Sequence, residues 1–285
     1  MTERLLKIAV PNKGALAEAA SEMLRSAGYR QRTDPKDLTL IDVDHNVEFY
    51  YLRPRDIAVY VGAGHLDLGI TGRDMLMDSE AEADEIMALG FGGSRFRFAA
   101  PVGGGNTVEN LAGKRIATSY PGLLQVWLDE QGIEASLVKL DGAVESAIRL
   151  GVADVVADVV DTGTTLRRAG LEMFGDSILT SEAILIRRRG GEDPAGIDGL
   201  RTRLDSVLVA DNYVMMDYNV AEKNLSATTA LAAGVNGPTV SQLAKNGWLA
   251  VRVLVPRKGA HLLMDRLFDA GARGILLTEL TACRL

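Results

Sequence analysis

The first two thirds of the chain alternate short apolar runs with amphipathic stretches. Leu5–Val10 is an apolar run that stops at Pro11, and Ala15–Ala27 then carries apolar residues at helical spacing before Gly28. Short apolar runs predict strands, and apolar residues every three to four positions predict helices. The same alternation predicts strands at 38–43, 47–52, 66–70, 95–101, 115–118, 136–140, 152–160 and 181–186, and helices at 54–60, 123–131, 143–150, 165–170 and 197–209.

The last 73 residues show a different order of predicted strands and helices. Apolar runs predict strands at 213–218, 239–243, 248–255 and 274–280, and helical spacing predicts helices at 221–232 and 260–270. This order, β-α-β-β-α-β, is that of the ferredoxin-like arrangement. The pattern therefore predicts an α/β protein with two lobes and a ferredoxin-like tail.

Four polar loops follow predicted strands and lead toward helices. They are residues 11–14, 71–74, 118–121 and 158–166, and each carries Gly, Thr or Ser. In open α/β sheets, ligands bind at the carboxyl ends of the strands. Taken singly, the first three loops are better explained as helix caps, and the fourth is explained about equally well as one. The four together predict a binding cleft between two lobes.

The loop at 158–166 gives the strongest signal. An apolar strand leads into a short polar loop with Gly163, and a helix follows. Backbone N–H groups of such a loop and the helix N-terminus converge on a phosphate. Hydroxyl groups of Thr162, Thr164 and Thr165 add donors, and the Asp158 carboxylate suits ribose hydroxyls or Mg²⁺. A strand–turn–helix with a Thr cap remains the alternative for this loop alone.

Charge and composition narrow the classes of ligand that the chain is expected to bind. The 285 residues carry a net charge of −7. From Tyr213 onward, eight Lys and Arg oppose five Asp and Glu, which gives +3 and leaves −10 for the first 212 residues. Nucleic acids prefer basic faces, so we expect no nucleic-acid partner. Three histidines and the single Cys283 disfavour a Cys- or His-based metal site.

Targeting signals are not evident in the sequence. The N-terminal residues lack the apolar run of a signal peptide. No stretch approaches the roughly 18 apolar residues of a membrane span. We therefore expect a cytoplasmic protein with no membrane partner.

Five segments resemble one enzyme family over essentially the whole chain. The segments are Val10–Leu16, Leu52–Ile57, Asp67–Asp74, Arg115–Pro121 and Asp158–Leu166. They resemble the long form of ATP phosphoribosyltransferase, the first enzyme of histidine biosynthesis. The resemblance implies a two-lobed, periplasmic-binding-protein-like catalytic core with a C-terminal ferredoxin-like (ACT-like) regulatory domain. It places lobe I at 1–94 and 182–211, lobe II at 95–181 and the regulatory domain at 212–285.

The resemblance also implies an activity and its partners. ATP and phosphoribosyl pyrophosphate would condense to phosphoribosyl-ATP and pyrophosphate, with Mg²⁺ as cofactor. Histidine would inhibit by feedback through the tail. The chain would form a homo-oligomer, from dimer to hexamer.

The family's substrate-binding residues map onto the strand-end loops. The backbone from Asp161 to Thr165, including Thr162, Gly163 and Thr164, would hold the 5-phosphate of the phosphoribosyl group. Asp158 would face the ribose and is the candidate metal ligand. The triphosphate and pyrophosphate candidates, which would also act in catalysis, are Lys13, Arg53 and Arg73. The further ATP candidates are Gly14 beside Lys13, and Asp74 and Tyr120 near the adenine and its ribose.

Two positions depart from the family pattern. Asp161 stands where many members have Ser or Gly, so the phosphate contacts there are expected from the backbone. The effector candidates in the tail are Asp217, Asn219, Thr239 and Gly274. Asn219 lies where an acid would pair better with the ammonium group of histidine.

Three other functions compete with this interpretation. Two hinged α/β lobes also suit a solute-binding module, since fold alone does not decide function. The phosphate loop would also serve a phosphoribosyltransferase that acts on a free base. A nucleic-acid-binding regulator is disfavoured by the acidic body.

Overall fold

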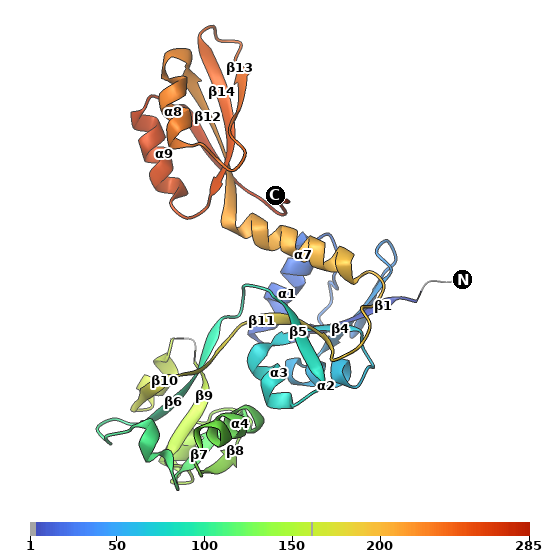
Figure 1. The fold of residues 1–285 in the computed structure, drawn as a ribbon, viewed down its shortest axis with the longest axis vertical. Helices are drawn as coiled ribbons and strands as arrows, with labels where there is room; N and C mark the ends of the chain where they lie inside the picture. Colours follow the sequence, from blue (N-terminus) through green and yellow to red (C-terminus); the bar gives the residue numbers. More distant parts are fainter. Residues whose placement is uncertain (1–3, 161) are drawn as a thin grey trace. The chain divides into compact units, whose positions relative to one another are not determined.

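The computed structural model describes residues 4–160 and 162–285. The chain divides into two compact units, residues 1–22 with 29–197 and residues 23–28 with 198–285. Figure 1 shows their elements in sequence colours. In the described residues, no helix has both the length and the apolar character needed to cross a membrane.

Lobe I is built on a six-stranded sheet of the first unit. The strand order is β2-β3-β1-β4-β11-β5, and the central β1 runs parallel to both β3 and β4. Strands buried on both faces read as continuous apolar runs, and Ile8, Ala9 and Val10 of β1 have no exposed surface. The strands are β1 Leu6–Pro11, β2 Thr39–Asp42, β3 Val47–Leu52, β4 Leu68–Gly72, β5 Ala83–Ala88 and β11 Ala183–Arg188. The helices that accompany them in sequence are α1 Ala15–Ser26, α2 Pro54–Gly62 and α3 Arg73–Ser79.

Lobe II is built on a five-stranded sheet of the same unit, in the order β10-β6-β9-β7-β8. Its core contains Phe96, Phe98 and Leu124, all without exposed surface. The strands are β6 Ser94–Pro101, β7 Arg115–Thr118, β8 Ser136–Lys139, β9 Val155–Val160 and β10 Leu171–Ser181. The helices are the 3₁₀ turn η1 Val108–Leu111 and the α-helices α4 Pro121–Gln131, α5 Ser146–Arg149 and α6 Thr164–Arg168.

Two neighbouring crossings join the lobes. The first leads from β5 to β6 and the second from β10 to β11. The Leu89 N–H donates to the Ala183 carbonyl oxygen at 2.9 Å, and the Ala183 N–H donates to the Phe91 carbonyl oxygen at 2.9 Å. Paired crossings of this kind are what the predicted two-lobed core requires.

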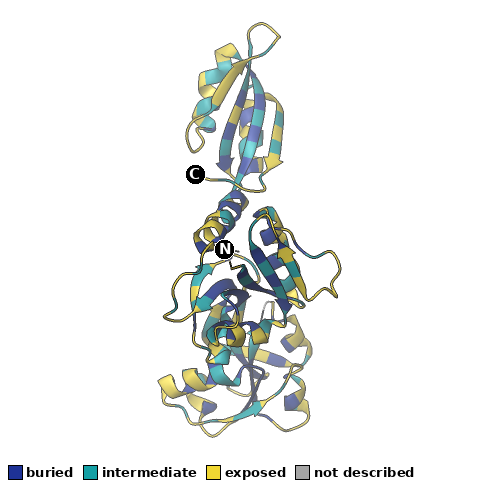
Figure 2. Cartoon of the chain, turned by 90° about the vertical axis from the view of Figure 1, so that its right-hand side faces the viewer, coloured by how far each residue is buried: buried dark blue, intermediate teal, exposed yellow. Residues whose placement is uncertain are grey.

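The second unit contains helix α7, Ile197–Asn212 apart from its first residue, and a four-stranded antiparallel sheet ordered β13-β14-β12-β15. Burial alternates along β12, as Figure 2 shows, because one face of the sheet packs on the core. The strands are β12 Tyr213–Ala221, β13 Thr239–Gln242, β14 Trp248–Pro256 and β15 Arg273–Glu279. The 3₁₀ turn η2 Glu222–Asn224 and the helices α8 Leu225–Leu231 and α9 Ala260–Asp269 complete the unit, and both α-helices contribute residues to the core.

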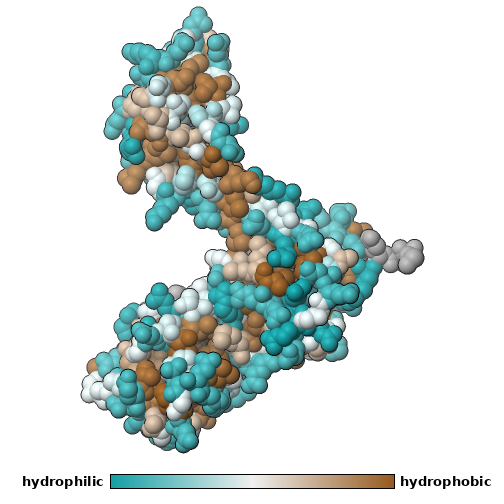
Figure 3. Space-filling model, in the orientation of Figure 1, coloured by the Kyte–Doolittle hydropathy of each residue, from teal (hydrophilic) through white to brown (hydrophobic). Residues whose placement is uncertain are grey.

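The surface of the second unit is not uniformly polar. Figure 3 shows hydrophobic residues among hydrophilic ones on its visible face. The exposed large apolar side chains of this unit include Leu262, Phe268 and Leu276.

The predicted α/β architecture with a ferredoxin-like tail is confirmed, but several elements differ from the sequence pattern. Strand β5 was not predicted, because its acidic residues lack alternation. Strand β10 was not predicted either, since Gly175 and Asp176 resemble a turn; they lie in a bulge of the β10–β6 pairing. The helix predicted at 221–232 was wrong at its start, because β12 continues to Ala221 and α8 begins at Leu225.

Candidate functional site

A cleft in the first unit collects residues that follow strands of both lobes. Lys13 and Gly14 follow β1, Arg53 follows β3, and Tyr120 lies two residues after β7. The cavity between them measures about 610 Å³. The lining residues are Lys13, Gly14, Arg53, Pro54, Arg55, Asp56, Met75, Ser119, Tyr120, Asp141, Gly142 and Asp158.

Three cations line this cleft. Within residues 4–160 and 162–285, no carboxylate forms an ion pair with Lys13 or Arg53. The Arg55 guanidinium donates to Asp78 at 3.0 Å and lies 4.3 Å from the centre of the Tyr120 ring. Cations that the protein leaves unpaired in a concave site are available to an anionic ligand.

The loop after β9 borders a second cavity, of about 380 Å³. Gly163 takes a left-handed conformation with φ of 70° and begins α6 as its N-cap. Backbone N–H groups at such a helix start favour an anion. Asp161 lies outside the described residues. The lining residues are Glu145, Asp158, Val159, Val160, Thr162, Gly163, Thr164, Thr165 and Leu166.

Side chains around this loop hold it in place. The Thr162 and Thr164 hydroxyl groups lie 3.0 Å apart. The Arg167 guanidinium donates to the Thr162 carbonyl oxygen at 3.0 Å. Arg167 therefore adds positive charge beside the loop, where a phosphate would be favoured.

Asp158 lines both cavities and joins them. Burial raises the pKa of its carboxyl to about 6, and the charges of Glu145 and Asp74 act in the same direction. A hydrogen bond from the Val159 backbone and the charge of Arg55 oppose this rise. Carboxylates with raised pKa in a cleft are typical of functional sites.

Asp74 and Tyr120 are brought together beside the cleft. Both are buried. The Ser181 hydroxyl donates to the Asp74 carboxylate at 2.9 Å. Burial and then the charge of Asp74 raise the pKa of Tyr120 above its ordinary value. Arg55 covers one face of the Tyr120 ring, so a base would stack on that face only if Arg55 moved.

Arg73 does not join the other predicted cations. Its guanidinium donates to Glu85 at 2.7 Å and to Glu182 at 3.2 Å, and it lines neither cavity. Hydrogen bonds with Glu85 raise the pKa of Arg73 above its ordinary value. The role of Arg73 therefore stays a prediction from the sequence, and two carboxylates of the first unit already pair with its guanidinium.

The four effector candidates lie on one region of the sheet in the second unit. Asp217 and Asn219 alternate with buried residues of β12, so they face away from the core. Arg252 donates to Asp217 at 2.7 Å and pairs across the strands with Thr239. A Cβ atom on Gly274 would lie 3.3 Å from the Asn219 amide nitrogen.

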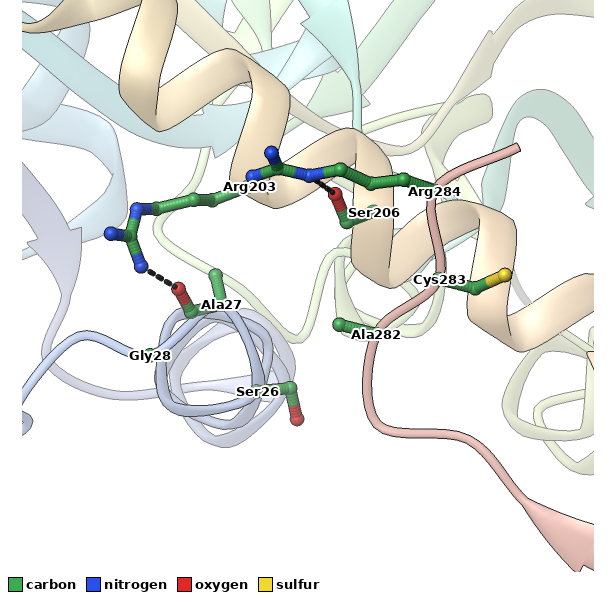
Figure 4. A pocket seen from close by; sticks show the side chains of 8 residues that line it. All are labelled: Ser26, Ala27, Gly28, Arg203, Ser206, Ala282, Cys283 and Arg284. Atoms are coloured by element: carbon green, nitrogen blue, oxygen red, sulfur yellow. Dashed lines mark hydrogen bonds between the residues drawn. The ribbon is translucent and has the colours of Figure 1, made fainter.

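Another pocket of the second unit, of about 310 Å³, is shown in Figure 4. The C-terminal segment lies along α7 there, because the Cys283 N–H donates to the Ser206 carbonyl oxygen at 2.8 Å. Arg284 donates to the Ser206 hydroxyl and Arg203 to the Ala27 carbonyl oxygen. None of the predicted site residues lines this pocket.

Sequence reasoning missed several cleft residues. Arg55 belongs to the family-like segment Leu52–Ile57, but the sequence pattern does not distinguish its side chain from that of Arg53. Asp141 follows β8, so the rule that ligands bind at strand ends would have found it. The missed residues at the two cavities include Arg55, Ser119, Asp141, Gly142 and Glu145. In the part of the chain that the structure describes, no cluster of three or more potential metal ligands occurs.

Comparisons with known proteins agree with the geometry. A family model described as ATP phosphoribosyltransferase matches residues 53–206, and one described as HisG, C-terminal domain, matches residues 210–282. An ATP phosphoribosyltransferase of Pseudarthrobacter chlorophenolicus is 56% identical over 284 residues, covering 99% of this chain and all of the relative. One of Micrococcus luteus is 57% identical over 283 residues, with the same coverage.

A solved structure is also similar. It is described as the ATP phosphoribosyl transferase (HisG:HisZ) complex from Thermotoga maritima. The TM-score is 0.60 at 25% identity, and the match covers 70% of this chain and 99% of that chain.

Proposed function

The chain belongs to the family of ATP phosphoribosyltransferases, enzymes of histidine biosynthesis, and we propose that it binds both substrates in the cleft between its α/β lobes. ATP and phosphoribosyl pyrophosphate condense there to phosphoribosyl-ATP and pyrophosphate. One observation carries this proposal. A glycine-bearing loop at a helix start and a cleft with unpaired cations meet at a single carboxylate, Asp158.

The loop after β9 is the proposed site of the phosphoribosyl group. Backbone N–H groups from Thr162 to Thr165 receive the 5-phosphate, as helix starts do for anions. The carboxylates of Asp158 and Glu145 border the same cavity and accept hydrogen bonds from the ribose hydroxyls. This placement directs the C1 atom of the ribose toward the larger cavity.

The cations of the larger cavity are the proposed site for the phosphates of ATP and for the leaving pyrophosphate. As the bond from C1 to the pyrophosphate oxygen breaks, negative charge grows on that oxygen. Lys13, Arg53 and Arg55 are placed to stabilise it. A ring nitrogen of adenine forms the new bond to C1, so alignment of the two substrates supplies much of the rate enhancement. Gly14, Asp74 and Tyr120 remain candidates for the ATP side.

Mg²⁺ fits this site as a companion of the substrate phosphates. Protein-bound Mg²⁺ keeps several waters and takes one or two carboxylates together with phosphate oxygens. Asp158 and Asp141 line the same cleft, and they are the residues that would hold it. The ion would neutralise phosphate charge when bound.

Regulation and assembly belong to the second unit in this proposal. Histidine binds at Asp217, Asn219, Thr239 and Gly274 and inhibits the reaction. The chain forms homo-oligomers, from dimer to hexamer, and works in the cytoplasm. The match of residues 210–282 to the C-terminal domain of the family supports a regulatory role of this unit.

Pyrophosphate release tests the proposal. We expect purified protein to release pyrophosphate only with ATP, phosphoribosyl pyrophosphate and Mg²⁺ together, and histidine to suppress the release. The variant Lys13→Ala/Arg53→Ala should lose the activity and keep its fold. No release from folded wild-type protein would favour the solute-binding alternative. Release that histidine leaves unchanged would keep the catalytic assignment and reject the effector assignment.

A further inference from the structure

A carboxylate of lobe I caps a helix of lobe II. Asp78 lies in α3, and its Oδ1 atom accepts hydrogen bonds from the N–H groups of Gly122 at 2.9 Å and Leu123 at 3.3 Å. The residue at the N-cap of α4, Tyr120, makes no side-chain cap, and Pro121 follows it. An acidic side chain at a helix N-terminus satisfies its N–H groups and favours its dipole. The other lobe therefore supplies the cap of α4.

The same carboxylate holds a cation of the cleft. Its Oδ2 atom accepts from Arg55 Nη1 at 3.0 Å. The Asp78 side chain is only 13% exposed, whereas that of Arg55 is 45% exposed and faces the cleft. The two oxygens of Asp78 thus serve different elements, a helix of lobe II and an arginine that lines the proposed active site.

The lobes meet closely at this point. A Cβ atom on Gly122 would clash with the Asp78 carbonyl oxygen, so only glycine fits there. Met75, one turn earlier in α3, packs against the core of lobe II. Packed contacts of this kind leave Asp78 little freedom, which suits a residue that fixes another.

We propose that Asp78 is a positioning residue, which couples the contact between the lobes to the place of the Arg55 guanidinium in the cleft. The inference rests on the proposed function, which assigns Arg55 to the leaving pyrophosphate. An arginine on a flexible stem reaches a ligand in many rotamers, and the contact with the Asp78 carboxylate restricts those of Arg55. Stabilisation of the leaving group belongs to the transition state, so loss of this restriction lowers kcat more than it raises KM.

Three variants separate positioning from capping. In Asp78→Asn, the amide oxygen still accepts from α4, but the amide nitrogen repels Arg55. We expect kcat to fall about tenfold with KM for phosphoribosyl pyrophosphate within about twofold, and Tm to stay within about 2 °C. Asp78→Ala should show the same loss of kcat and a further drop in Tm. Asp129→Asn, at the other end of α4 and outside the cleft, is the matched control and should change neither.

A double-mutant cycle with Arg55→Ala tests whether Asp78 affects kcat through Arg55. If Asp78 acts through Arg55, Asp78→Asn has no further effect on kcat in the Arg55→Ala background. If the losses of kcat in the two single variants multiply in the double variant, the inference is overturned and Asp78 acts only as a helix cap. An unchanged kcat in Arg55→Ala, with activity lost in Lys13→Ala/Arg53→Ala, would also overturn it and leave the proposed function standing. Full activity in Arg55→Ala and in Lys13→Ala/Arg53→Ala would reject both this inference and the proposed function.

Discussion

The cleft of the first unit and the open sheet face of the second unit differ in whether their charged side chains have ion-pair partners. In the described cleft, Lys13 and Arg53 have no ion-pair partner, and Asp158 is half-buried with a raised pKa. On the sheet face, Asp217 and Arg252 pair with each other at 2.7 Å. Unpaired charges in a concave site have a ligand to bind, whereas paired charges are already satisfied. The two regions should therefore respond differently to substitution.

The difference follows from the two sheet types. Parallel strands of an α/β lobe end together, so the loops after β1, β3, β7 and β8 converge on one cavity. An antiparallel sheet with one face on the core instead presents its other face as a broad surface. Residues on such a face are neighbours across strands, as Asp217 and Arg252 are, and they reach each other before they reach a ligand.

The largest expected effect comes from a cleft cation. Arg53→Ala should lower kcat/KM by about 100- to 1000-fold, because a preorganised group that stabilises charge developing in the transition state is worth about 3 to 4 kcal/mol. Tm should not change, since Arg53 forms no ion pair within the described residues. Steady-state pyrophosphate release and a thermal melt measure both quantities. Arg201→Ala, an exposed arginine of α7, is the control. An unchanged kcat/KM would remove Arg53 from the site.

Asp158→Asn should give the next largest effect, this time on stability. The pKa of Asp158 is about 6 in the fold against an ordinary value of 3.8, so the folded state binds the proton more tightly. Stability is therefore lost as the pH rises from about 3.8 through about 6, by about 3 kcal/mol at 1.36 kcal/mol for each pKa unit. The neutral amide avoids this loss.

We accordingly expect Asp158→Asn to be more stable than the wild type at pH 8 and equal to it near pH 4. Urea unfolding at the two pH values measures the difference. Its catalytic activity should fall, since the amide no longer accepts from ribose hydroxyls as a carboxylate does. A variant less stable at pH 8 would show that the carboxylate has a partner that stabilises it.

Local patterns explain which parts of the site were predictable. The loop from Thr162 to Thr165 follows an apolar strand and precedes a helix, and both signals lie within a few residues of it. Arg73 also follows a strand, but its partner Glu182 is 109 residues away and arrives on the crossing that leads to β11. Periodicity contains no information on such a contact. Strand β10 was missed for a related reason, because its register with β6 shifts at a bulge that holds Gly175 and Asp176.

A smaller effect is expected from the phosphate loop itself. In Gly163→Ala, the left-handed φ of 70° costs about 1 to 2 kcal/mol, and the new Cβ lies 3.0 Å from Met173 Cε. KM for phosphoribosyl pyrophosphate should rise about tenfold with KM for ATP unchanged. Gly170→Ala is the matched control, because φ is 76° there and no atom lies within 4 Å. Equal changes in both variants would indicate general backbone strain and no specific role of the loop.

The smallest effect on the fold should come from the paired charges of the second unit. The Arg252 side chain is 65% exposed, and exposed ion pairs contribute about 0.2 to 1 kcal/mol. Asp217→Asn should therefore leave kcat unchanged and shift Tm by no more than about 2 °C. If Asp217 binds the ammonium group of histidine, the concentration of histidine for half inhibition should rise severalfold. Glu279→Gln, which breaks the exposed pair with Arg257 in the same unit, is the matched control. Equal histidine sensitivity in the two variants would show that Asp217 only pairs with Arg252. Asp217 of the sheet face would then have its partner within the protein, whereas Lys13 and Arg53 of the cleft would be the charges that meet a ligand.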